Sequence, residues 1–312
     1  MSSDKKGLCV VTGAGGFLGS HLCEYLVSKG NTVVGISRTN RFLDEKLLSH
    51  PRFYFIEQDL CLVSPEQLLE IGSTVDVIFH LASQQPSFPD LQYEDFYQGN
   101  VVTTLKIIDL ANKLSVKTVI YTSTITVFGY AEDVLKEDSC VSPPNYYGLT
   151  KYIAEKLLEF YSKDSKRERK AIVFRLPSVF GNNHLGGIVH TICSLAKQNK
   201  EIEVFSKVER IKTLISDKTV VEALYLGWQK SLSLFRNFEL FLIADEPAIR
   251  LIDIAKLVVE TMDSHSKIVL SDKKVGLDWD IIVDVTKAKE VLGFRPRNLV
   301  TALKDYVREV WM

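Results

Sequence analysis

The stretch VVTGAGGFLGSHL, residues 10–22, decides the fold. It joins the apolar, β-branched run at 8–12 to a run with apolar residues at helical spacing, so its glycines lie between a predicted strand and a predicted helix. Gly13, Gly16 and Gly19 have the spacing of a phosphate-binding turn, in which glycine permits close approach of the backbone. The amino end of the helix offers N–H groups and the positive end of its dipole to a pyrophosphate. The stretch predicts a dinucleotide-binding loop, with a purely structural turn as the alternative.

Strands and helices alternate along the first half of the chain. Strands are predicted at 31–38, 53–60, 76–83, 117–124 and 170–177, and helices at 64–71, 93–113 and 147–162. Because these strands are nearly all apolar, we expect them to be parallel and covered on both faces. The predicted fold class is α/β, a doubly wound parallel sheet of the Rossmann type, whose ligands bind along the edge where the strands end.

After residue 178 the alternation becomes less regular. We expect a smaller C-terminal α/β lobe on the substrate side, made of residues 178–208 and 246–312. Residues 1–177 are expected to form the dinucleotide-binding domain, to which a segment of about 209–245 returns.

Composition argues against several classes of protein. The formal net charge of −1 and a sequence pI of about 6.6 give no basic footprint for nucleic acid. No apolar stretch reaches the roughly 20 residues of a membrane span, and the N-terminal residues do not have the pattern of a signal peptide. The five cysteines are scattered, as expected of reduced thiols in the cytoplasm. His80 is interpreted as a core histidine, because no second His or carboxylate lies at ligand spacing, so we expect no metal. From the charge and the lack of an apolar span, we expect no nucleic-acid or membrane partner.

The end of the second predicted strand bears on the choice of dinucleotide. NAD sites usually place an acidic side chain there, which binds the ribose hydroxyls. Here the strand ends in Ser37 and Arg38, and a guanidinium beside a hydroxyl suits the 2′-phosphate of NADP. The sequence therefore favours NADP over NAD; the alternative is an exposed Arg38 that does not discriminate.

Residues 143–155, PPNYYGLTKYIAE, hold a candidate acid–base pair. Tyr147 and Lys151 are four residues apart in a predicted helix, so they share one face. A nearby ammonium would lower the tyrosine pKa from its usual value of about 10, so that the phenol could act near neutral pH. Tyr146 is the rival tyrosine, but its partner four residues on is Thr150, which carries no charge.

Several motifs follow one order and spacing that is typical of a known family. They are TGxxGxxG near the N-terminus, HLA at 80–82, Asn100, STITVFG at 123–129, YGLTK at 147–151 and RLPSVFG at 175–181. The chain resembles the extended short-chain dehydrogenase/reductase family, in its sugar-nucleotide epimerase/dehydratase group, over nearly its whole length. Residues 284–296, DVTKAKEVLGFRP, also resemble the C-terminal pattern of that group.

The resemblance implies a role for each matching residue. Thr124 is expected to hydrogen-bond the reacting oxygen of the substrate. Tyr147 is expected to be the acid–base group, and Lys151 to lower its pKa and hold the nicotinamide ribose, with support from Asn100. The implied cofactor contacts are Gly13, Gly16, Phe17, Leu18, Gly19, Ser37, Arg38, Asp59, Leu60, Leu81, Ala82, Asn100, Ser123, Tyr147, Lys151 and Pro177. The implied substrate contacts are Ser83, Thr124, Ser178, Arg210 and Lys274.

Three departures from the family pattern narrow the choice among dehydration, reduction and epimerisation. Ile-Thr at 125–126 replaces the Asp-Glu pair that dehydratases of this group usually carry. Ser37 and Arg38 indicate NADPH, which drives net reduction, whereas an epimerase retains its cofactor and typically uses NAD. Ser178 and Lys274 stand where epimerases commonly carry Asn and Arg, so the substrate contacts carry over less securely than the cofactor contacts.

Together these features predict an NADP(H)-dependent reductase of a nucleotide-linked keto-sugar, with hydride transfer to a sugar carbonyl at C4. The alternative is a nucleotide-sugar epimerase with tightly bound NAD(P). A reductase of a small carbonyl compound and a non-enzymatic dinucleotide sensor are further alternatives. The resemblance also implies a homodimer through the helices that include 93–113 and 147–162.

Overall fold

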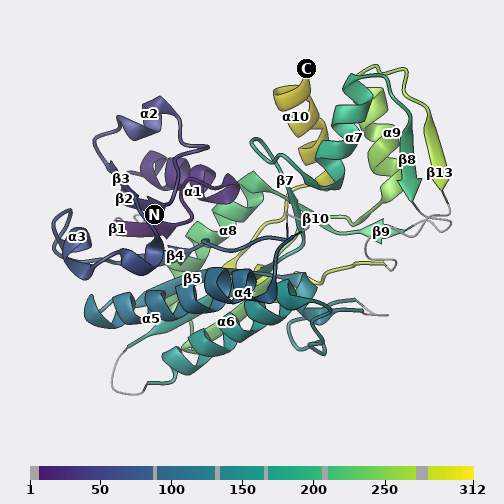
Figure 1. Cartoon of the computed structure of the whole chain (residues 1–312). Coiled ribbons are helices and arrows are strands. Elements are labelled where there is room, and N and C mark those ends of the chain that lie inside the picture. The colour runs from purple at the N-terminus through teal and green to yellow at the C-terminus, as the bar shows by residue number, and fades with distance from the viewer. Residues whose placement is uncertain (1–6, 87–89, 131–133, 165–167, 206–209, 272–279) are drawn as a thin grey trace. The chain divides into compact units, whose positions relative to one another are not determined.

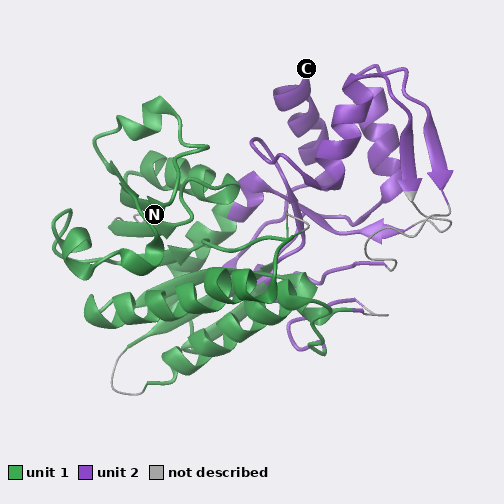
Figure 2. Ribbon diagram, viewed as in Figure 1, with its two compact units in different colours: residues 1–129, 140–175, 221–241 green, residues 130–139, 176–220, 242–312 purple. Residues whose placement is uncertain are grey.

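The computed structural model describes residues 7–86, 90–130, 134–164, 168–205, 210–271 and 280–312. The chain divides into two compact units, coloured green and purple in Figure 2. Unit 1 comprises Met1–Gly129, Cys140–Arg175 and Val221–Phe241, and unit 2 comprises Tyr130–Ser139, Leu176–Val220 and Leu242–Met312.

A seven-stranded sheet forms the centre of unit 1, in the order β11-β6-β5-β4-β1-β2-β3 (Figure 1). The order changes direction at β1, where Thr12 is paired in register with Ile36 of β2 and with His80 of β4. Doubly wound sheets bind their ligands at this point, beyond the strand ends. The predicted doubly wound parallel sheet is confirmed. Its strands are β1 (Leu8–Thr12), β2 (Thr32–Ser37), β3 (Phe53–Glu57), β4 (Val77–His80), β5 (Thr118–Thr124), β6 (Lys170–Leu176) and β11 (Phe238–Leu242).

The helices around this sheet largely follow the predicted positions. The helix predicted at 64–71 is shorter, because Pro65 opens it after Ser64. The helix predicted at 93–113 is continuous, but its middle, Tyr97–Val102, is π-helical. The helices are α1 (Phe17–Ser28), α2 (Glu45–Leu48), α3 (Pro65–Leu69), α4 (Tyr93–Phe96), α5 (Thr103–Lys113), α6 (Tyr146–Ser162) and α8 (Asp217–Lys230), which starts in unit 2.

Successive side chains of a strand point to opposite faces of the sheet, and both faces are buried. Ile78 of β4 packs into a core with Ile107 of α5 and Leu158 of α6, two helices that lie side by side in Figure 1. The next residue, Phe79, contacts Trp228 of α8 instead, with ring centroids 6.2 Å apart. Helices therefore cover both faces, which explains why the strands are apolar throughout.

Unit 2 has its own core, in which Ile192 of α7, Ile254 of α9 and Leu303 of α10 pack together. Its strands form small pairings: β7 with β10, β9 with β12, and β8 with β13. The pair of β8 and β13 is seen beside α9 in Figure 1. The elements are β7 (Ser178–Phe180), α7 (Gly187–Lys197), β8 (Ile202–Phe205), β9 (Ile211–Lys212), β10 (Leu214–Ser216), β12 (Ile249–Arg250), α9 (Leu251–Thr261), β13 (Ile268–Ser271) and α10 (Leu299–Trp311).

The boundaries between the units differ from the expected ones at two places. The segment that returns to unit 1 is Val221–Phe241, shorter than 209–245, because β9 and β10 pair with strands of unit 2. Tyr130–Ser139 belongs to unit 2, where the Leu135 N–H donates to the Ile282 carbonyl oxygen at 2.8 Å. No helix within the described ranges is long and apolar enough to cross a membrane.

Candidate active site

The glycine loop between β1 and α1 is packed too closely for side chains. Gly13 has a φ of +71°, in the left-handed region, and a Cβ there would press on the backbone of Ala82. A Cβ on Gly19 would collide with the carbonyl oxygen of Gly13. The Gly13 N–H donates to the Ile36 carbonyl oxygen at 2.9 Å, which ties the loop to β2.

The start of α1 fits a dinucleotide diphosphate. Gly16 is its N-cap, so no side chain caps the first turn, which holds Phe17, Leu18 and Gly19. A Cβ on Gly16 would meet only the Gly13 carbonyl oxygen, at 3.1 Å, so this side of the loop leaves space for a ligand. The N–H groups of the turn, at the positive end of the helix dipole, are the groups that would hold the diphosphate of NAD(P).

The end of β2 lies beside an acidic residue of the neighbouring strand. Ser37 is paired in register with Glu57 of β3, and the Ser37 Oγ lies 3.2 Å from a Cβ built on Gly15. Residues in register on neighbouring strands point to the same face, so Glu57 brings a carboxylate beside Ser37. Arg38 is exposed. Sequence reasoning missed Glu57, because only the pairing of the strands brings it to the end of β2.

Asp59 and Leu60 follow β3 as one short turn. The Asp59 carboxylate accepts a hydrogen bond of 2.8 Å from the Cys61 N–H, and Leu60 is buried. The turn fixes the backbone at the position that the resemblance assigns to adenine.

The end of β4 is held by a buried histidine. The His80 Nδ1 lies 2.8 Å from the Thr12 Oγ1, and its Nε2 lies 3.2 Å from the Thr104 Oγ1. Burial, with a smaller effect of the Lys151 charge, lowers the His80 pKa to about 3, so the ring is neutral. The predicted core role of His80 is confirmed. Leu81 and Ala82 follow directly, and the Ala82 N–H donates to the Thr12 Oγ1 at 3.2 Å.

Asn100 lies inside the π-helical segment Tyr97–Val102. Its Oδ1 accepts hydrogen bonds from the Ser83 hydroxyl and the Gln84 N–H, both at 2.8 Å. Its Nδ2 donates to the Thr150 Oγ1 at 2.9 Å. Asn100 therefore joins the loop after β4 to α6 through Thr150, the residue before Lys151.

Tyr147 lies in the first turn of α6, and its hydroxyl hydrogen-bonds the side chains of Gln85 and Thr124. Burial raises the Tyr147 pKa, and these two hydrogen bonds act in the opposite direction. Gln85 is a site residue that the sequence did not reveal, since its loop meets α6 only in the folded chain. Tyr146 is 57% exposed, which agrees with its rejection as the acid–base group.

Lys151 is buried one turn further along α6. Its Nζ donates a hydrogen bond of 2.6 Å to the Thr122 carbonyl oxygen and lies 4.2 Å from the centre of the Tyr121 ring. Burial lowers the Lys151 pKa to about 7. The negative charge of the Glu155 carboxylate acts in the opposite direction and raises this pKa. The sequence predicts that this ammonium lowers the Tyr147 pKa; here burial dominates, and the Tyr147 pKa is raised.

The remaining predicted contacts lie in unit 2 or outside the described residues. Pro177 is buried and Ser178, in β7, is exposed. The Arg210 carbonyl oxygen accepts a hydrogen bond of 3.0 Å from the Leu251 N–H. Lys274 lies outside the described residues. The cofactor role of Pro177 and the substrate roles of Ser178, Arg210 and Lys274 stay predictions.

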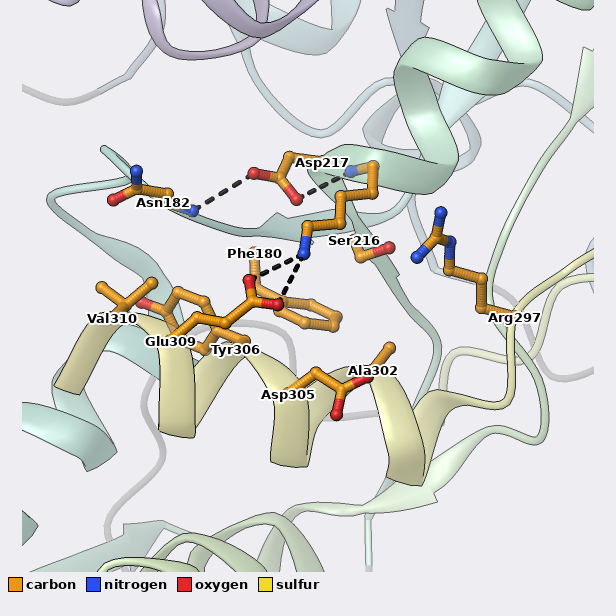
Figure 3. Close-up of a pocket in the computed structure, with 11 residues that line it drawn as sticks. Phe180, Asn182, Ser216, Asp217, Arg297, Ala302, Asp305, Tyr306, Glu309 and Val310 are labelled. Atoms are coloured by element: carbon orange, nitrogen blue, oxygen red, sulfur yellow. Dashed lines mark hydrogen bonds and ion pairs between the residues drawn. The ribbon is translucent and has the colours of Figure 1, made fainter. Parts of the chain in front are cut away.

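A small cavity of about 40 Å³ lies in unit 2, beside α10 (Figure 3). Two of its lining residues form an ion pair: the Lys218 Nζ contacts both carboxylate oxygens of Glu309, at 2.7 and 2.9 Å. The volume suffices for a few water molecules. Ser178 and Arg210 are not among its lining residues, so the cavity is not the candidate site. The described residues contain no group of three or more His, Cys, Asp or Glu side chains that could hold a metal ion.

Comparisons with known proteins agree with this geometry. The sequence model of the NAD dependent epimerase/dehydratase family matches residues 9–233. An uncharacterized UDP-glucose epimerase, YtcB of Bacillus subtilis (strain 168), is 28% identical over 314 residues, which cover 95% of this chain and 94% of that protein. UDP-glucuronic acid decarboxylase 2 of Arabidopsis thaliana is 27% identical over 329 residues, which cover 98% of this chain and 70% of that protein. The structure of a UDP-glucose 4-epimerase from Thermotoga maritima, with UDP-glucose, superimposes with a TM-score of 0.82 at 25% identity, covering 97% of this chain and 99% of that one.

Proposed function

The chain belongs to the NAD dependent epimerase/dehydratase family, and on this premise we propose that it is an NAD-dependent epimerase of a UDP-linked sugar. The sequence put a keto-sugar reductase first, but the names of the similar proteins support the epimerase alternative. The observation that carries the proposal is the hydrogen bond between Tyr147 and Thr124, with Lys151 on the same face of α6. A tyrosine in this setting can take a proton from a sugar hydroxyl and return it.

Each of these side chains has one task in the proposed reaction. The positive charges of bound NAD and of the Lys151 ammonium would favour the phenolate form of Tyr147. As the phenolate, Tyr147 would take the proton of the C4 hydroxyl as C4 is oxidised, and return it to the same oxygen when C4 is reduced from its other face. Thr124 donates a hydrogen bond to that oxygen and stabilises the charge on it. Bound NAD supplies a reversible hydride acceptor. The sum is inversion at C4 with no net change in electrons or protons.

The proposed cofactor is NAD rather than the NADP that Ser37 and Arg38 suggest. NAD sites bind the ribose hydroxyls through a carboxylate near the end of β2. Glu57 supplies a carboxylate in register with Ser37, although it comes from β3. A carboxylate there repels the 2′-phosphate of NADP and accepts hydrogen bonds from the hydroxyls of NAD.

A reductase of a nucleotide-linked keto-sugar is the second candidate function, and the exposed Arg38 favours it. Turnover separates the two candidates. The protein is incubated with UDP-glucose, UDP-glucuronic acid or UDP-N-acetylglucosamine and NAD, or with the matching 4-keto-sugar and NADPH. Interconversion of two sugars, with constant absorbance of reduced nicotinamide, supports the epimerase. Stoichiometric loss of NADPH supports the reductase.

We also propose the homodimer that the resemblance implies, through α5 and α6. Leu105 of α5 and Phe160 of α6 are 44% and 81% exposed, and apolar residues in such positions suit a contact between copies. Light scattering tests this proposal: a dimer is expected, and Phe160→Glu should weaken it. A monomeric wild type would rule it out.

A further inference from the structure

A buried ion pair lies directly behind the candidate acid–base residues. The Arg175 Nη2 lies 2.7 Å from the Glu155 Oε2, and the Arg175 Nε donates to the Glu155 Oε1 at 3.0 Å. The Arg175 and Glu155 side chains are only 3% and 2% exposed. Removing two charges from water is costly, and an apolar pair of similar volume is often as stable. Stability alone therefore does not account for two buried charges at this place, which points to a further role for the pair.

The same carboxylate also holds the end of β5. The Glu155 Oε1 accepts a hydrogen bond of 2.5 Å from the Ser123 hydroxyl. Ser123 lies between Thr122 and Thr124 in the chain. The Thr122 carbonyl oxygen accepts a hydrogen bond from the Lys151 ammonium, and the Thr124 side chain hydrogen-bonds Tyr147. Glu155 is thus linked to the segment of β5 that contacts both members of the acid–base pair.

Glu155 is also the carboxylate that acts on the charge of Lys151. It lies one turn further along α6, and its charge raises the Lys151 pKa while burial lowers it. The other groups that face Lys151 do not replace this charge. His80 of β4 is neutral, and burial keeps Tyr121 of β5 in its neutral form. Tyr147 of α6 is likewise neutral, since its pKa is raised.

We propose that Glu155, held by Arg175 of β6, is a positioning residue that keeps Lys151 cationic and fixes residues 122–124 against α6. The inference rests on the proposed function only in taking Lys151 and Tyr147 as the acting residues. Arg175 in turn fixes the Glu155 carboxylate through two hydrogen bonds. The guanidinium is itself held over the Phe128 ring, 4.6 Å from the ring centre.

The test is a pH titration of Lys151 in the protein alone, without substrate or cofactor. Lysine side chains are labelled with ¹³C next to the amino group, and the Lys151 resonance is assigned by its loss in Lys151→Met. Glu155→Gln keeps the shape of the side chain and removes its charge. The Lys151 midpoint is expected to fall by about one pH unit, because the cation loses its counter-charge. An unmoved midpoint would overturn the proposal.

Glu159→Gln is the matched control, since Glu159 lies one turn further along α6 and pairs with Lys156 and Lys163 at the surface. It should leave the Lys151 midpoint in place; an equal shift in both variants would contradict the proposal. If Glu155→Gln does not fold, the double variant Glu155→Met with Arg175→Met removes both buried charges and is titrated instead. Its midpoint should also fall, and an unchanged midpoint overturns the proposal.

Activity gives a second, independent readout. With an identified substrate, the alkaline limb of the kcat profile should move to lower pH in Glu155→Gln, because Lys151 loses its proton sooner. A merely structural role would lower kcat equally at every pH. If the proposed epimerase activity is absent, the titration of Lys151 still decides this inference. If the titration fails, the turnover of UDP-sugars is still open to measurement.

Discussion

The Lys151 ammonium donates a hydrogen bond of 2.6 Å to the carbonyl oxygen of Thr122. Two residues further along β5, the Thr124 side chain hydrogen-bonds the Tyr147 hydroxyl. The end of one strand therefore positions both the tyrosine and the lysine of the candidate acid–base pair. A change in the backbone at this strand end would displace both groups. The geometry of the site therefore depends on how β5 packs against α6.

Tyr147→Phe tests which tyrosine moves the proton. The variant keeps the ring and removes only the hydroxyl that contacts Thr124 and Gln85, so turnover of the identified sugar should fall by about 10²–10⁴-fold. Tyr146→Phe is the matched control, because Tyr146 is 57% exposed on the adjacent position, and it should keep nearly wild-type kcat. Comparable losses in both variants would refute the assignment of Tyr147.

The sequence predicted the sheet and the helix that carries Tyr147 and Lys151, because both depend on local patterns. The apolar strands and the glycine loop have fixed spacing, and Tyr147 and Lys151 lie on one helix. Glu57 and Gln85 were missed because neither belongs to a local motif. Glu57 reaches its place through the pairing of β2 with β3, and Gln85 through a loop that folds onto α6. The lowered pKa of Lys151 could not be predicted from the sequence either, because burial is a property of the folded chain.

Gln85→Met tests the second hydrogen bond to Tyr147. Methionine keeps the length of the side chain and cannot donate to the phenol oxygen, so the phenolate loses a partner that lowers its pKa. The acidic limb of the kcat profile should move to higher pH, and kcat near neutrality should fall by up to about tenfold, the value of one hydrogen bond. Gln84→Met serves as the control, because the bond from the Gln84 N–H to Asn100 is retained. A profile that does not move would exclude Gln85 from the site.

Lys151→Met should stabilise the fold most at low pH. Burial lowers the Lys151 pKa to about 7 in the folded chain, below the ordinary lysine value of 10.5, so the unfolded chain binds the proton more tightly. Below pH 7 the folded state carries the whole cost of the buried charge, and above it the cost falls as the proton leaves. The gain in unfolding free energy from Lys151→Met should therefore shrink by about 3 kcal/mol between about pH 6 and about pH 9.

Lys156→Met is the control for this measurement by urea unfolding. Lys156 is exposed on the same helix and pairs with Glu159, which raises its pKa, so its contribution to stability should not change over this pH range. A pH-independent gain for Lys151→Met would show that the lysine does not titrate in the folded chain.

Two substitutions with opposite charge effects test the choice of cofactor. Glu57→Gln removes the carboxylate in register with Ser37 and should weaken NADH binding more than NADPH binding. Arg38→Asp removes the guanidinium that suits a 2′-phosphate and should weaken NADPH binding much more than NADH binding. Dissociation constants for both cofactors, from quenching of protein fluorescence, give the comparison. Equal effects on the dissociation constants of NADH and NADPH would show that neither residue discriminates between the two cofactors.

The fate of a deuterium atom at C4 tests the central claim most directly. UDP-glucose, UDP-glucuronic acid and UDP-N-acetylglucosamine, each deuterated at C4, are incubated with the protein and NAD, and the products are followed by NMR. We predict that one of them yields its C4 epimer with deuterium still at C4 and no net reduced nicotinamide, since the same hydride leaves and returns. The absence of any C4 epimer would contradict the epimerase. Transfer of the deuterium to NAD, with release of the reduced cofactor and consumption of NAD in proportion to product, would also contradict it.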